Sequence, residues 1–588
     1  MCGIVGYIGK GNAKDFVVGA LKKLEYRGYD SWGISLIENN NLKVIKETGK
    51  ISKVVSKNIT SNSHLAIGHT RWATHGGVTK ENAHPHTDCA QNLAVVHNGI
   101  INNFEILKNN LIKKGHKFTS ETDTEVIPHL VEENLKKNQS IVEAFRISLN
   151  ALQGDYAICL ISQNENKIYI AVNGCPLAIG IGKDVKYISS DLLAFADFTS
   201  DVILMRDGTL AEVGTEIKIY DIKTGTLKKV NSQKISTEFF QAKLGTFKHF
   251  LFKEINEQPK ILEKIVAMDK KEIETNAALI RNSFGTFFVA CGTAYHAALS
   301  AEYFFARFAK IHVNTAIASE FPAFGNFITD KTLLFAISQS GETADVIDAV
   351  KTARAKKAKI FSLLNNPNST LGRLSDVVML TPAGKEIAVL STKAFTSQLA
   401  ILYLLSCATA SDLVKAERNL KITAYEVLEI LKNSNIDHIK KLAKILKNSK
   451  NIFTIGRGLN FPTALEAALK IKEVSYIHAE GFAGGELKHG TIALIEKDVP
   501  CIVFVSNDET KDVILSNAQE IKARGGYIIG VAPEANKVFD YFLKVADLPD
   551  LSPILNIVPI QVLAYFLALE KGLDPDKPRN LAKSVTVK

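Results

Sequence analysis

The second residue of the chain, Cys2, has the chemistry of a nucleophile that carries its own base. Methionine aminopeptidase removes an initiator Met that precedes a small residue, and its removal here would leave Cys2 with a thiol and a free α-amino group. The thiolate is the reactive form of cysteine, and an α-amino group titrates near neutral pH, at about 7.7–8.0. A chance cysteine in an edge strand is the simpler interpretation of the dipeptide, but the apolar residues 4–8 indicate a buried strand that would draw this terminus inside.

Four polar residues further along the chain could hold and hydrolyse an amino-acid amide. Arg71 offers a two-pronged partner for an α-carboxylate, and Asp123 offers a partner for an α-ammonium group. The side-chain amide of Asn98 and the backbone N–H of Gly99 could form an oxyanion hole. Each residue also has an ordinary structural interpretation: Arg71 is a surface charge, Asp123 a helix cap, and the Asn98-Gly99 pair a hairpin turn.

Short apolar segments are expected to position these residues. Strands are predicted at residues 65–68, 93–96, 156–160 and 167–171, and helices at residues 13–26 and 103–114. Arg71 and Asn98 would then follow strands, and Asp123 would lie in a loop before a helix. The pattern predicts two stacked sheets flanked by helices.

The motifs of this region also occur in a familiar order. Cys2-Gly3-Ile4-Val5-Gly6, Arg27-Gly28, Arg71-Trp72-Ala73-Thr74-His75-Gly76, His97-Asn98-Gly99 and Asp123 together resemble the class II glutamine amidotransferase domain, over about the first 215 residues. That domain is an N-terminal nucleophile hydrolase, so the resemblance implies a four-layer αββα fold that releases ammonia from glutamine. It implies Cys2 as nucleophile and Asn98 with Gly99 as oxyanion hole. It implies glutamine-binding roles for Arg71, Trp72, Thr74, His75 and Asp123, with Trp72 as the ammonia-gating aromatic residue. Trp32 departs from the small residue expected after Ser31.

The histidines and cysteines do not predict a metal site. His84 and His86 are spaced as two ligands, but a third and a fourth ligand are missing from their surroundings in the sequence. The seven cysteines are odd in number, widely spaced and without CxxC pairs. This pattern favours free thiols in a reducing compartment over a disulfide framework or a zinc site.

From about residue 286 the pattern changes to short apolar strands that alternate with long helical segments, which predicts βαβ units and parallel sheets. Matching residues recur at nearly the same separation: Gly292 with Gly456, Thr343 with Thr510 and Gln398 with Gln561. These pairs indicate two copies of one domain.

The first copy contains a candidate anion site. Ser338, Ser340 and Thr343 stand where a strand leads into a helix, and hydroxyls and backbone N–H groups at a helix N-terminus bind phosphate. A helix cap without a ligand is the alternative interpretation. The second copy has Val505, Asn507 and Asp508 in place of Ser338, Ser340 and Gly341, listed in matching order. A carboxylate would repel phosphate, so a phosphate site is predicted in the first copy only.

A predicted helix at residues 460–477 carries charged residues among apolar ones. Glu466, Lys470 and Glu473 share one face at spacings of four and three. A solvated ion-pair stripe is the usual explanation, but the apolar neighbours leave little polar surface. Buried Glu and Lys side chains have displaced pKa values and suit proton transfer. The glycine-rich segment 480–490, with His489, is typical of a loop.

The second half resembles paired sugar-isomerase (SIS) domains, and the whole chain resembles the family of glucosamine-6-phosphate synthases. The resemblance implies glutamine and fructose 6-phosphate as substrates, glucosamine 6-phosphate and glutamate as products, and internal transfer of ammonia. Lys583 would form a Schiff base with the open-chain ketose, and Glu473 would move a proton between C1 and C2. His489 would assist ring opening from a neighbouring subunit, in a homodimer. Lys470 is the remaining catalytic residue implied.

The same resemblance implies a set of sugar-phosphate-binding residues: Cys291, Gly292, Thr293, Ser338, Gln339, Ser340, Thr343 and Ser391. It implies no metal and no cofactor. Three positions depart from the family pattern. Ala294 replaces a serine, Thr491 replaces a proline, and Lys588 ends the chain where glutamate is usual.

The length of 588 residues predicts several domains. We expect an amidotransferase domain at 2–215 (α+β), a linker at 216–274, two Rossmann-like SIS domains with parallel sheets at 275–430 and 431–575 (α/β), and a tail at 576–588. The net charge of +10 is scattered without a basic block, which disfavours nucleic acid. The uncharged segments 394–410 and 551–569 contain polar interruptions that favour buried helices over membrane spans, so a cytoplasmic location is expected.

Two other functions fit part of these patterns. Other class II amidotransferases share the first domain, but a phosphoribosyltransferase or nucleotide-binding half would need motifs that the sequence does not contain. A sugar-phosphate sensor could use SIS domains for binding alone. Such a sensor has no use for Cys2 or for the charged face of residues 466–473.

Overall fold

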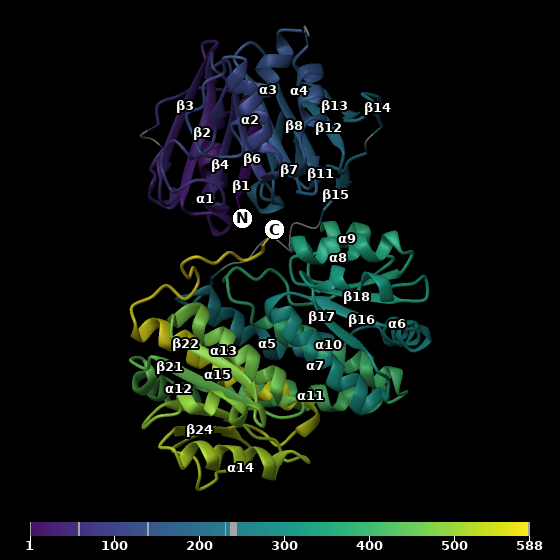
Figure 1. Cartoon of the computed structure of the whole chain (residues 1–588), viewed down its shortest axis with the longest axis vertical. Coiled ribbons are helices and arrows are strands. Elements are labelled where there is room, and N and C mark those ends of the chain that lie inside the picture. The colour runs from purple at the N-terminus through teal and green to yellow at the C-terminus, as the bar shows by residue number, and fades with distance from the viewer. Residues whose placement is uncertain (1, 57–58, 138–139, 230, 236–243, 586–588) are drawn as a thin grey trace. The chain divides into compact units, whose positions relative to one another are not determined.

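The computed structural model describes residues 2–56, 59–137, 140–229, 231–235 and 244–585. They belong to two compact units, one of residues 1–241 with 584–588 and one of residues 242–583 (Figure 1). Each unit has its own sheets and hydrophobic core.

The first unit contains two antiparallel sheets. The eight-stranded sheet has the order β15 (Gln233–Lys234), β11 (Asp201–Leu204), β9 (Ala178–Gly182), β10 (Val185–Ser189), β1 (Gly3–Gly9), β4 (Leu65–Arg71), β2 (Ser31–Glu38) and β3 (Asn41–Thr48). The seven-stranded sheet has the order β14 (Leu227–Lys228), β13 (Ile217–Asp221), β12 (Thr209–Val213), β8 (Ile168–Asn173), β7 (Gly154–Ser162), β6 (Leu93–Ile101) and β5 (His86–Thr87). Its helices are α1 (Ala13–Lys23), α2 (Phe104–Lys113), α3 (Val126–Leu135) and α4 (Ile141–Asn150).

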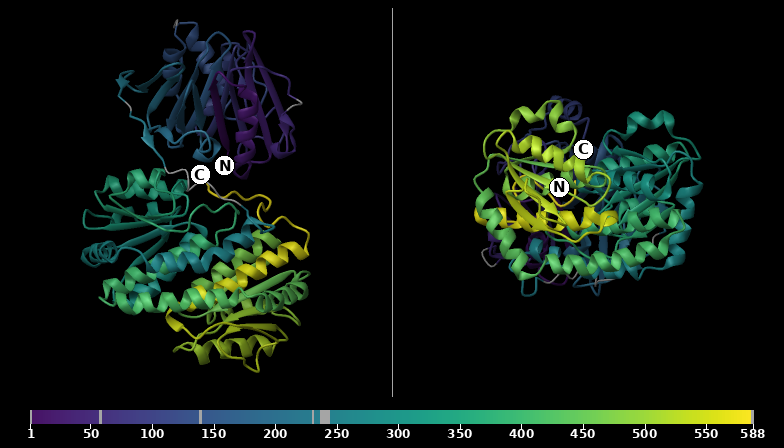
Figure 2. Two further views of the ribbon diagram at one scale, coloured as in Figure 1. Left: turned by 180° about the vertical axis from the view of Figure 1, so that it is seen from behind. Right: turned by 90° about the horizontal axis from the view of Figure 1, so that it is seen from below.

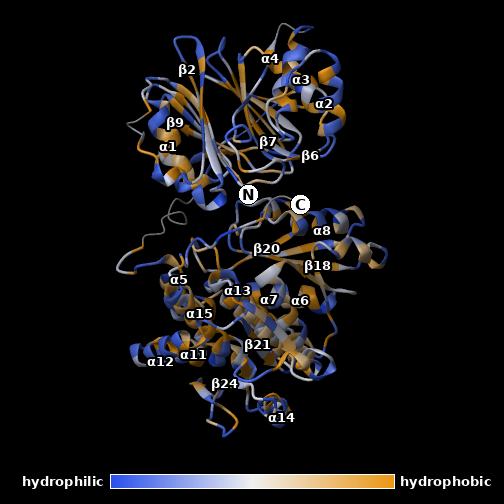
Figure 3. Ribbon diagram, turned by 60° about the vertical axis from the view of Figure 1, so that its left-hand side comes forward, coloured by the Kyte–Doolittle hydropathy of each residue, from blue (hydrophilic) through white to orange (hydrophobic). Residues whose placement is uncertain are grey.

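Three hydrophobic clusters show that this unit has four layers. One cluster lies between the two sheets and includes Ile4 and Ile67 from one sheet and Val96 and Ile170 from the other. A second cluster packs α1 on the eight-stranded sheet, and a third packs α3 and α4 on the seven-stranded sheet. In Figure 3 the helices α2, α3 and α4 carry both hydrophobic and hydrophilic residues, as expected for helices with one buried face. The predicted αββα architecture is confirmed.

The N-terminal strand β1 is an inner strand, hydrogen-bonded to both β4 and β10. Its pairing with β4 places Gly3 opposite Thr70, which sets Cys2 beside the end of β4. The predicted buried strand after Cys2 is therefore present.

Two predicted strands are longer than expected. Strand β4 continues to Arg71, and β6 runs through His97, Asn98 and Gly99 to Ile101. The Asn98-Gly99 pair is therefore neither a hairpin turn nor a segment after a strand. Gly99 has a φ of 125°, and a Cβ there would lie 2.0 Å from the carbonyl oxygen of Asp155 on β7, so glycine is required.

The second unit contains two parallel five-stranded sheets. The first has the order β17 (Asn314–Ile317), β16 (Phe287–Ala290), β18 (Leu333–Ser338), β19 (Lys359–Leu364) and β20 (Val377–Leu380). The second has the order β22 (His478–Ala483), β21 (Asn451–Gly456), β23 (Pro500–Phe504), β24 (Tyr527–Ala532) and β25 (Tyr541–Lys544). The identical strand order confirms the predicted duplication.

The longer helices of this unit are α5 (Phe250–Val266), α6 (Lys270–Asn282), α7 (Gly292–Phe304), α8 (Ala344–Ala355), α10 (Lys393–Thr409), α11 (Leu413–Ile430), α12 (Asn433–Leu446), α13 (Asn460–Ser475), α14 (Lys511–Lys522) and α15 (Ser552–Glu570). A short helix α9 (Thr370–Leu374) precedes β20. Figure 2 gives two further views of these helices.

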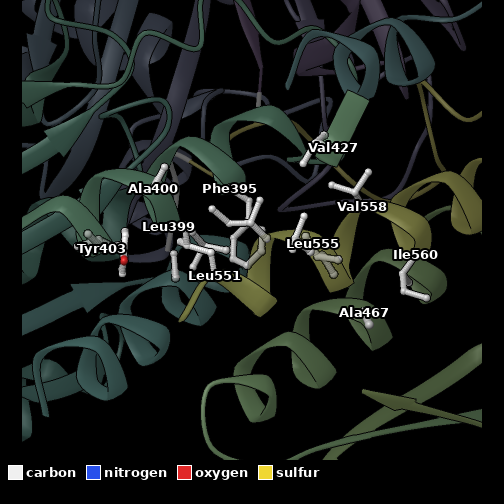
Figure 4. Close-up of a cluster of buried hydrophobic side chains, with 14 of the residues drawn as sticks. Phe395, Leu399, Ala400, Tyr403, Val427, Ala467, Leu551, Leu555, Val558 and Ile560 are labelled. Atoms are coloured by element: carbon white, nitrogen blue, oxygen red, sulfur yellow. The ribbon is translucent and has the colours of Figure 1, made fainter. Parts of the chain in front are cut away.

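One hydrophobic core joins the two copies. It contains residues of both parallel sheets and of the helices α5, α7, α10, α11, α13 and α15. Figure 4 shows part of it, where Leu399 of α10, Val427 of α11 and Leu555 of α15 come together. The outer faces of the two sheets have separate clusters, with α8 on the first and α14 on the second.

The two uncharged segments form α10 and α15, both buried almost throughout. Among the described residues, one helical stretch, Pro549–Glu570, is long and apolar enough to cross a membrane, and 94% of its most apolar window is buried inside the fold. Burial of this degree is typical of a core helix, in agreement with the sequence-based interpretation.

The sequence analysis assigned residues 216–274 to a linker, but the structure places parts of this segment in both folded units. Strand β13 belongs to the seven-stranded sheet, and α5 packs on α10 and α11 in the core of the second unit. Leu251, Ile255 and Leu262 of α5 are fully buried. Polar and charged residues separate these apolar positions, which is the pattern of a helix with one buried face.

Candidate active site

Cys2 lies where the inner strand β1 meets the end of β4. Its Sγ is 3.6 Å from the Trp72 carbonyl oxygen, and the Trp72 backbone N–H donates to the sulfur at 3.3 Å. The Cys2 carbonyl oxygen accepts from Asn98 Nδ2 at 3.0 Å and from Arg27 Nε at 3.3 Å. Close packing requires Gly28 here, because a Cβ would lie 2.8 Å from the Arg71 carbonyl carbon.

A histidine without an assigned role in the sequence analysis positions Asn98. His69 Nε2 lies 3.1 Å from Asn98 Oδ1 and 3.0 Å from the His97 carbonyl oxygen. Burial lowers the pKa of His69 to about 3, so the ring is neutral. With its Oδ1 held by His69, Asn98 directs its NH₂ group toward Cys2. That group has two hydrogens, and the Cys2 carbonyl uses one.

Arg71 is buried and binds its own loop. Its Nη2 donates to the carbonyl oxygens of His75 at 2.5 Å and Gly76 at 3.1 Å, and its Nη1 donates to that of Gly77 at 3.0 Å. Burial lowers the pKa of Arg71, and the nearby charges of Asp30 and Asp123 partly offset that effect. A guanidinium group has five N–H donors, so two remain for a ligand.

Asp123 is 4% exposed and does not cap a helix. Its Oδ2 accepts from the Ile101 backbone N–H at 2.8 Å, which ties the loop before α3 to the end of β6. Trp72 and His75 are half-buried and Thr74 is exposed. The His75 ring meets Phe104 edge to face, with the ring centres 5.5 Å apart.

Among the described residues, His84 and His86 belong to no group of three or more converging metal-ligand atoms. His84 Nδ1 accepts from the His97 backbone N–H at 3.3 Å, and His86 Nε2 lies 3.1 Å from Thr122 Oγ1. Burial lowers the pKa of both rings well below the ordinary value. A different set of described side chains, which the sequence analysis missed, converges on one point: Cys89, His116, His129 and Glu132.

In the second unit, the charged face of α13 meets the start of α7. Lys470 Nζ is 2.7 Å from Glu473 Oε2 and 3.3 Å from Glu466 Oε1. Thr293 accepts from Lys470 at 3.0 Å and donates to Glu466 at 3.0 Å. Glu466 and Lys470 are fully buried, so the predicted charged face is not a solvated stripe.

Two findings refine this cluster. His296 Nδ1 lies 2.7 Å from Glu466 Oε2, a contact that the sequence analysis did not predict. Burial alone would lower the pKa of Lys470, but Glu466 and Glu473 more than offset that effect and raise it. Lys470 is therefore a fixed cation and not a base, and Glu473 is the member of the trio that is partly exposed.

The predicted anion site is a cluster of hydroxyl groups at the start of α8. Ser338 Oγ lies 3.1 Å from Thr343 Oγ1 and accepts from the Gly341 N–H at 3.0 Å, and Ser340 Oγ accepts from the Glu342 N–H at 3.1 Å. Thr343 precedes the helix but makes no capping bond with its side chain. Gly341 has a φ of 68°, and a Cβ there would lie 2.1 Å from Ser369 Oγ.

Cys291 and Gly292 form the turn from β16 into α7, where Gly292 has a φ of 54°. Burial raises the pKa of the Cys291 thiol to about 11, so it is not a nucleophile. Gln339 is half-buried in the loop after β18, where its carbonyl oxygen accepts from the Asn365 N–H at 3.3 Å.

Lys583 binds a carboxylate that the sequence analysis did not assign. Its Nζ donates to Glu386 Oε2 at 2.5 Å, and Ser391 Oγ donates to the same oxygen at 3.3 Å. The other Glu386 oxygen accepts from the backbone N–H groups of Thr392 and Ala394 at the start of α10. Burial would raise the pKa of Glu386, but Lys583, the Thr392 backbone N–H and Lys393 together outweigh burial and lower it.

The remaining predicted positions lie outside these clusters. His489 is exposed at the end of a short 3₁₀ helix, and Thr491 starts the next one. Ala294, in the first turn of α7, packs partly buried against the core. Trp32 is buried in the cluster between α1 and its sheet. Lys588 lies outside the described residues.

Known proteins are similar to parts of this chain and to the whole of it. The family model described as "Glutamine amidotransferase domain" matches residues 69–197, and that described as "SIS domain" matches residues 279–408 and 445–539. A glutamine–fructose-6-phosphate aminotransferase [isomerizing] from Pyrococcus horikoshii is 43% identical over 597 aligned residues, with 100% of each chain covered. Its counterpart from Thermococcus kodakarensis is also 43% identical, again over 100% of each chain.

A solved structure resembles the second unit. The C-terminal domain of glucosamine-fructose-6-phosphate aminotransferase from Francisella tularensis matches with a TM-score of 0.54 and 35% identity, covering 57% of this chain and 100% of that one. The amidotransferase and SIS models, the full-length relatives and this neighbour agree with one another. The chain therefore belongs to the family of isomerising glutamine–fructose-6-phosphate aminotransferases.

Proposed function

We propose that this protein converts fructose 6-phosphate and glutamine into glucosamine 6-phosphate and glutamate. The full-length identity to aminotransferases of this name carries the proposal, because it covers both the amide-hydrolysing and the sugar-binding units. Ammonia released from glutamine is transferred internally to the sugar. Neither half-reaction as proposed assigns a role to a metal or a cofactor.

In the first unit, Cys2 attacks the carboxamide carbon of glutamine. Removal of Met1 leaves the Cys2 amine as the base that accepts the thiol proton and returns it to the leaving ammonia. Asn98, through its second N–H, and the Gly99 N–H stabilise the oxyanion. Water then hydrolyses the thioester to release glutamate. Arg71 and Asp123 bind the α-carboxylate and the α-ammonium group of glutamine.

Trp72, Thr74 and His75 complete this first site. The contacts of Arg71 with the carbonyl groups of residues 75–77 support its role, because they hold the loop that carries these side chains against β4. Trp72 directs ammonia away from bulk water.

In the second unit, hydroxyl groups at the start of α8 bind the sugar phosphate, together with Cys291, Gly292 and Gln339 at the neighbouring strand ends. Lys583 forms an imine at C2 of the open-chain ketose and releases water. Ammonia then replaces the Lys583 amine at C2, and Glu473 moves a proton from C1 to C2, which leaves the amine on C2 and the aldehyde at C1. Lys470 orients Glu473 and compensates its charge, and Thr293 links both to the start of α7. Ser391 shares Glu386 with Lys583, which supports placing it at the sugar site.

The reaction is tested by giving the full-length protein fructose 6-phosphate and glutamine labelled with ¹⁵N in the amide. Mass spectrometry should find the label in glucosamine 6-phosphate, and Cys2→Ala should abolish labelling while leaving sugar-phosphate binding intact. Unlabelled product, or glutamate without any amino sugar, would contradict the proposed function.

The role of Lys583 is tested by reductive trapping. Borohydride added together with fructose 6-phosphate should attach the sugar to Lys583, and peptide mapping locates the adduct. Lys488, an exposed lysine paired with Glu520, is the internal control and should remain unmodified. An adduct on another lysine would reassign the imine.

We also propose a homodimer in which His489 of one subunit serves the sugar site of the other. Its exposure, away from the contacts around Glu473, supports this assignment. Mixing the inactive variants His489→Ala and Lys583→Ala should restore about a quarter of the activity, because half of the dimers are mixed and each has one intact site. No recovery would place His489 in its own subunit's site.

A cytoplasmic location is part of the same proposal. All seven cysteines are free, and a reducing compartment keeps them so. Fractionation of cells that express the protein should find it with the soluble cytoplasmic enzymes.

A further inference from the structure

Four side chains of the first unit meet at one point away from the residues assigned to glutamine. Cys89 follows β5, His116 follows α2, and His129 and Glu132 lie one turn apart on α3. One potential ligand atom from each lies within 4.8 Å of all the others. These residues come from three segments of the chain and have no part in the proposed reaction.

Four of the six distances between the ligand atoms match those of a tetrahedral metal site, and the other two are within 4.8 Å. Cys89 Sγ is 3.6 Å from His116 Nδ1 and 3.5 Å from His129 Nδ1. Glu132 Oε2 is 3.1 Å from His116 Nδ1 and 3.4 Å from His129 Nδ1. With Zn–S of about 2.3 Å and Zn–N or Zn–O of about 2.0–2.1 Å, tetrahedral angles give about 3.5 Å between sulfur and nitrogen and about 3.3 Å between nitrogen and oxygen.

The surroundings of the two imidazoles also fit a metal. His116 Nε2 lies 3.2 Å from Glu133 Oε2, and His129 Nε2 faces Glu125 Oε1 at 3.8 Å. Each ring therefore has a carboxylate at both nitrogens, but a neutral imidazole has only one N–H. A cation at each Nδ1 resolves this conflict, because each Nε2–H then points at its outer carboxylate. Carboxylates placed behind ligating histidines are a regular feature of zinc sites.

The charges and the exposure agree with this interpretation. A thiolate of Cys89 and the carboxylate of Glu132 balance the two charges of Zn²⁺, and binding releases the thiol proton. The Lys117 backbone N–H points at Cys89 Sγ at 3.5 Å, as expected beside a thiolate. The two histidines are buried, whereas Cys89 is exposed, so an ion could enter from solvent.

We propose that Cys89, His116, His129 and Glu132 bind one structural zinc ion. Four protein ligands close the coordination shell, which distinguishes the site from a catalytic zinc centre with an open position. The ion would join the loop after β5, the loop after α2 and helix α3. Because Glu125 stands behind His129 and also accepts from the backbone N–H groups of Thr119 and Ser120, the site would brace the loop that carries Asp123.

The site can be tested on the full-length protein, purified without a histidine tag and without chelators. Elemental analysis should find about one zinc per chain, and zinc X-ray absorption should show one sulfur and three nitrogen or oxygen ligands. Cys89→Ser and His116→Gln should each lose most of the zinc. His64→Gln, which changes an exposed histidine of the same unit, should keep all of it.

A second readout does not depend on how well the variants fold. Zinc should protect Cys89 of the wild-type protein from alkylation although this thiol is exposed, and a strong chelator should make it reactive and lower the Tm. Re-addition of Zn²⁺ should reverse both effects.

Three results would overturn the proposal. The first is a purified protein that contains less than about a tenth of an equivalent of zinc per chain and that also binds no added Zn²⁺. Another is an absorption spectrum without a sulfur ligand. The third is Cys89 that alkylates at the same rate with and without chelator, because the four side chains would then be joined by hydrogen bonds alone.

Discussion

The two parallel-sheet halves of residues 242–583 have the same strand order but different polar residues at equivalent places. After β18, three hydroxyl groups gather before α8. After β23, the Asp508 carboxylate occupies the equivalent turn, where it accepts from the Thr510 backbone N–H at 2.9 Å and from the Thr510 hydroxyl at 2.7 Å. The second copy thus has a carboxylate in the turn that corresponds to the hydroxyl groups of the first copy.

The helix that follows the first strand of each copy also differs, but here the second copy carries most of the charged residues. Helix α13 carries Glu466, Lys470 and Glu473, whereas α7 contributes Thr293 and His296 to the same cluster. Duplication therefore supplied two equivalent scaffolds. In the proposed reaction the first copy binds the phosphate and the second supplies the acid and base.

The largest effect is expected from removing the base of the second copy. Glu473→Gln keeps the shape of the side chain but cannot accept a proton, so isomerisation should fall by about 10²–10⁴-fold. Separate assays of glucosamine 6-phosphate and of glutamate should show that glutamine hydrolysis at Cys2 persists. Near-normal sugar turnover would transfer the role of base to another residue.

The second-largest effect is expected from placing in the first copy a carboxylate like that of Asp508 in the second copy. Ser340→Asp places a carboxylate among the hydroxyl groups before α8 and should raise the fructose 6-phosphate KM at least about tenfold, with a smaller change in kcat. Asp508→Asn is the matched control in the second copy and should leave KM unchanged. An unchanged KM in Ser340→Asp would move the phosphate site elsewhere.

The pH dependence of stability should differ between variants of two glutamates of α5, Glu254 and Glu257. Burial and the nearby Glu386 raise the pKa of Glu254 to about 8, against an ordinary value of 4.5. Between these values the native state holds a proton that the unfolded chain has lost, so this group's contribution to stability falls as pH rises from about 4.5 to 8. Glu254→Gln stays neutral, so the margin by which its Tm exceeds that of the wild type should grow from about pH 4.5 to 8 and then level off.

Glu257, on the same helix, is the control with the opposite sign. Burial would raise its pKa, but Lys253 and Lys393 outweigh burial and lower it. The contribution of Glu257 to the stability of the fold is therefore present above its ordinary pKa and is lost in acid. Glu257→Gln should accordingly lower the Tm at neutral pH. Equal Tm shifts for the two variants at every pH would contradict the assignment of these charges.

The smallest effect is expected at Ala294, where this chain departs from its family. The residue lies in the first turn of α7 and packs against the core. Ala294→Ser should lower the fructose 6-phosphate KM by about two- to threefold and leave kcat unchanged, because a hydrogen bond to phosphate is largely replaced by water when it is missing. A changed kcat would show that this position affects the reacting carbons.

The features predicted correctly are those that repeat along the chain. Alternation and apolar runs located β1 and β4, helical periodicity located α13, and the recurring pairs revealed the duplicated sheets. The segment containing α5 was assigned to a linker because its residues are polar on average, although one face of the helix is buried. Strand β6 was cut short because Asn98 and Gly99 have low strand propensity, and pairing with β7 overrides it.

The residues missed around the sites act through tertiary contacts. Glu386 stands in a loop, and only the fold brings it to Lys583. His69 lies within a strand and acts on Asn98 of the facing sheet. The four proposed zinc ligands come from three segments, so no short spacing marks them, and an odd count of scattered cysteines pointed away from a metal.

The position of β1 also has a consequence for the timing of synthesis. The strand is made first, but one of its two neighbours, β10, ends at Ser189. At about 5–20 residues per second, translation needs roughly 10–40 s to supply that partner. Throughout that interval the first residues of the chain remain accessible at the ribosome. Because the proposed reaction needs a free amine on Cys2, excision of Met1 would take place on the nascent chain, before β1 pairs with β10.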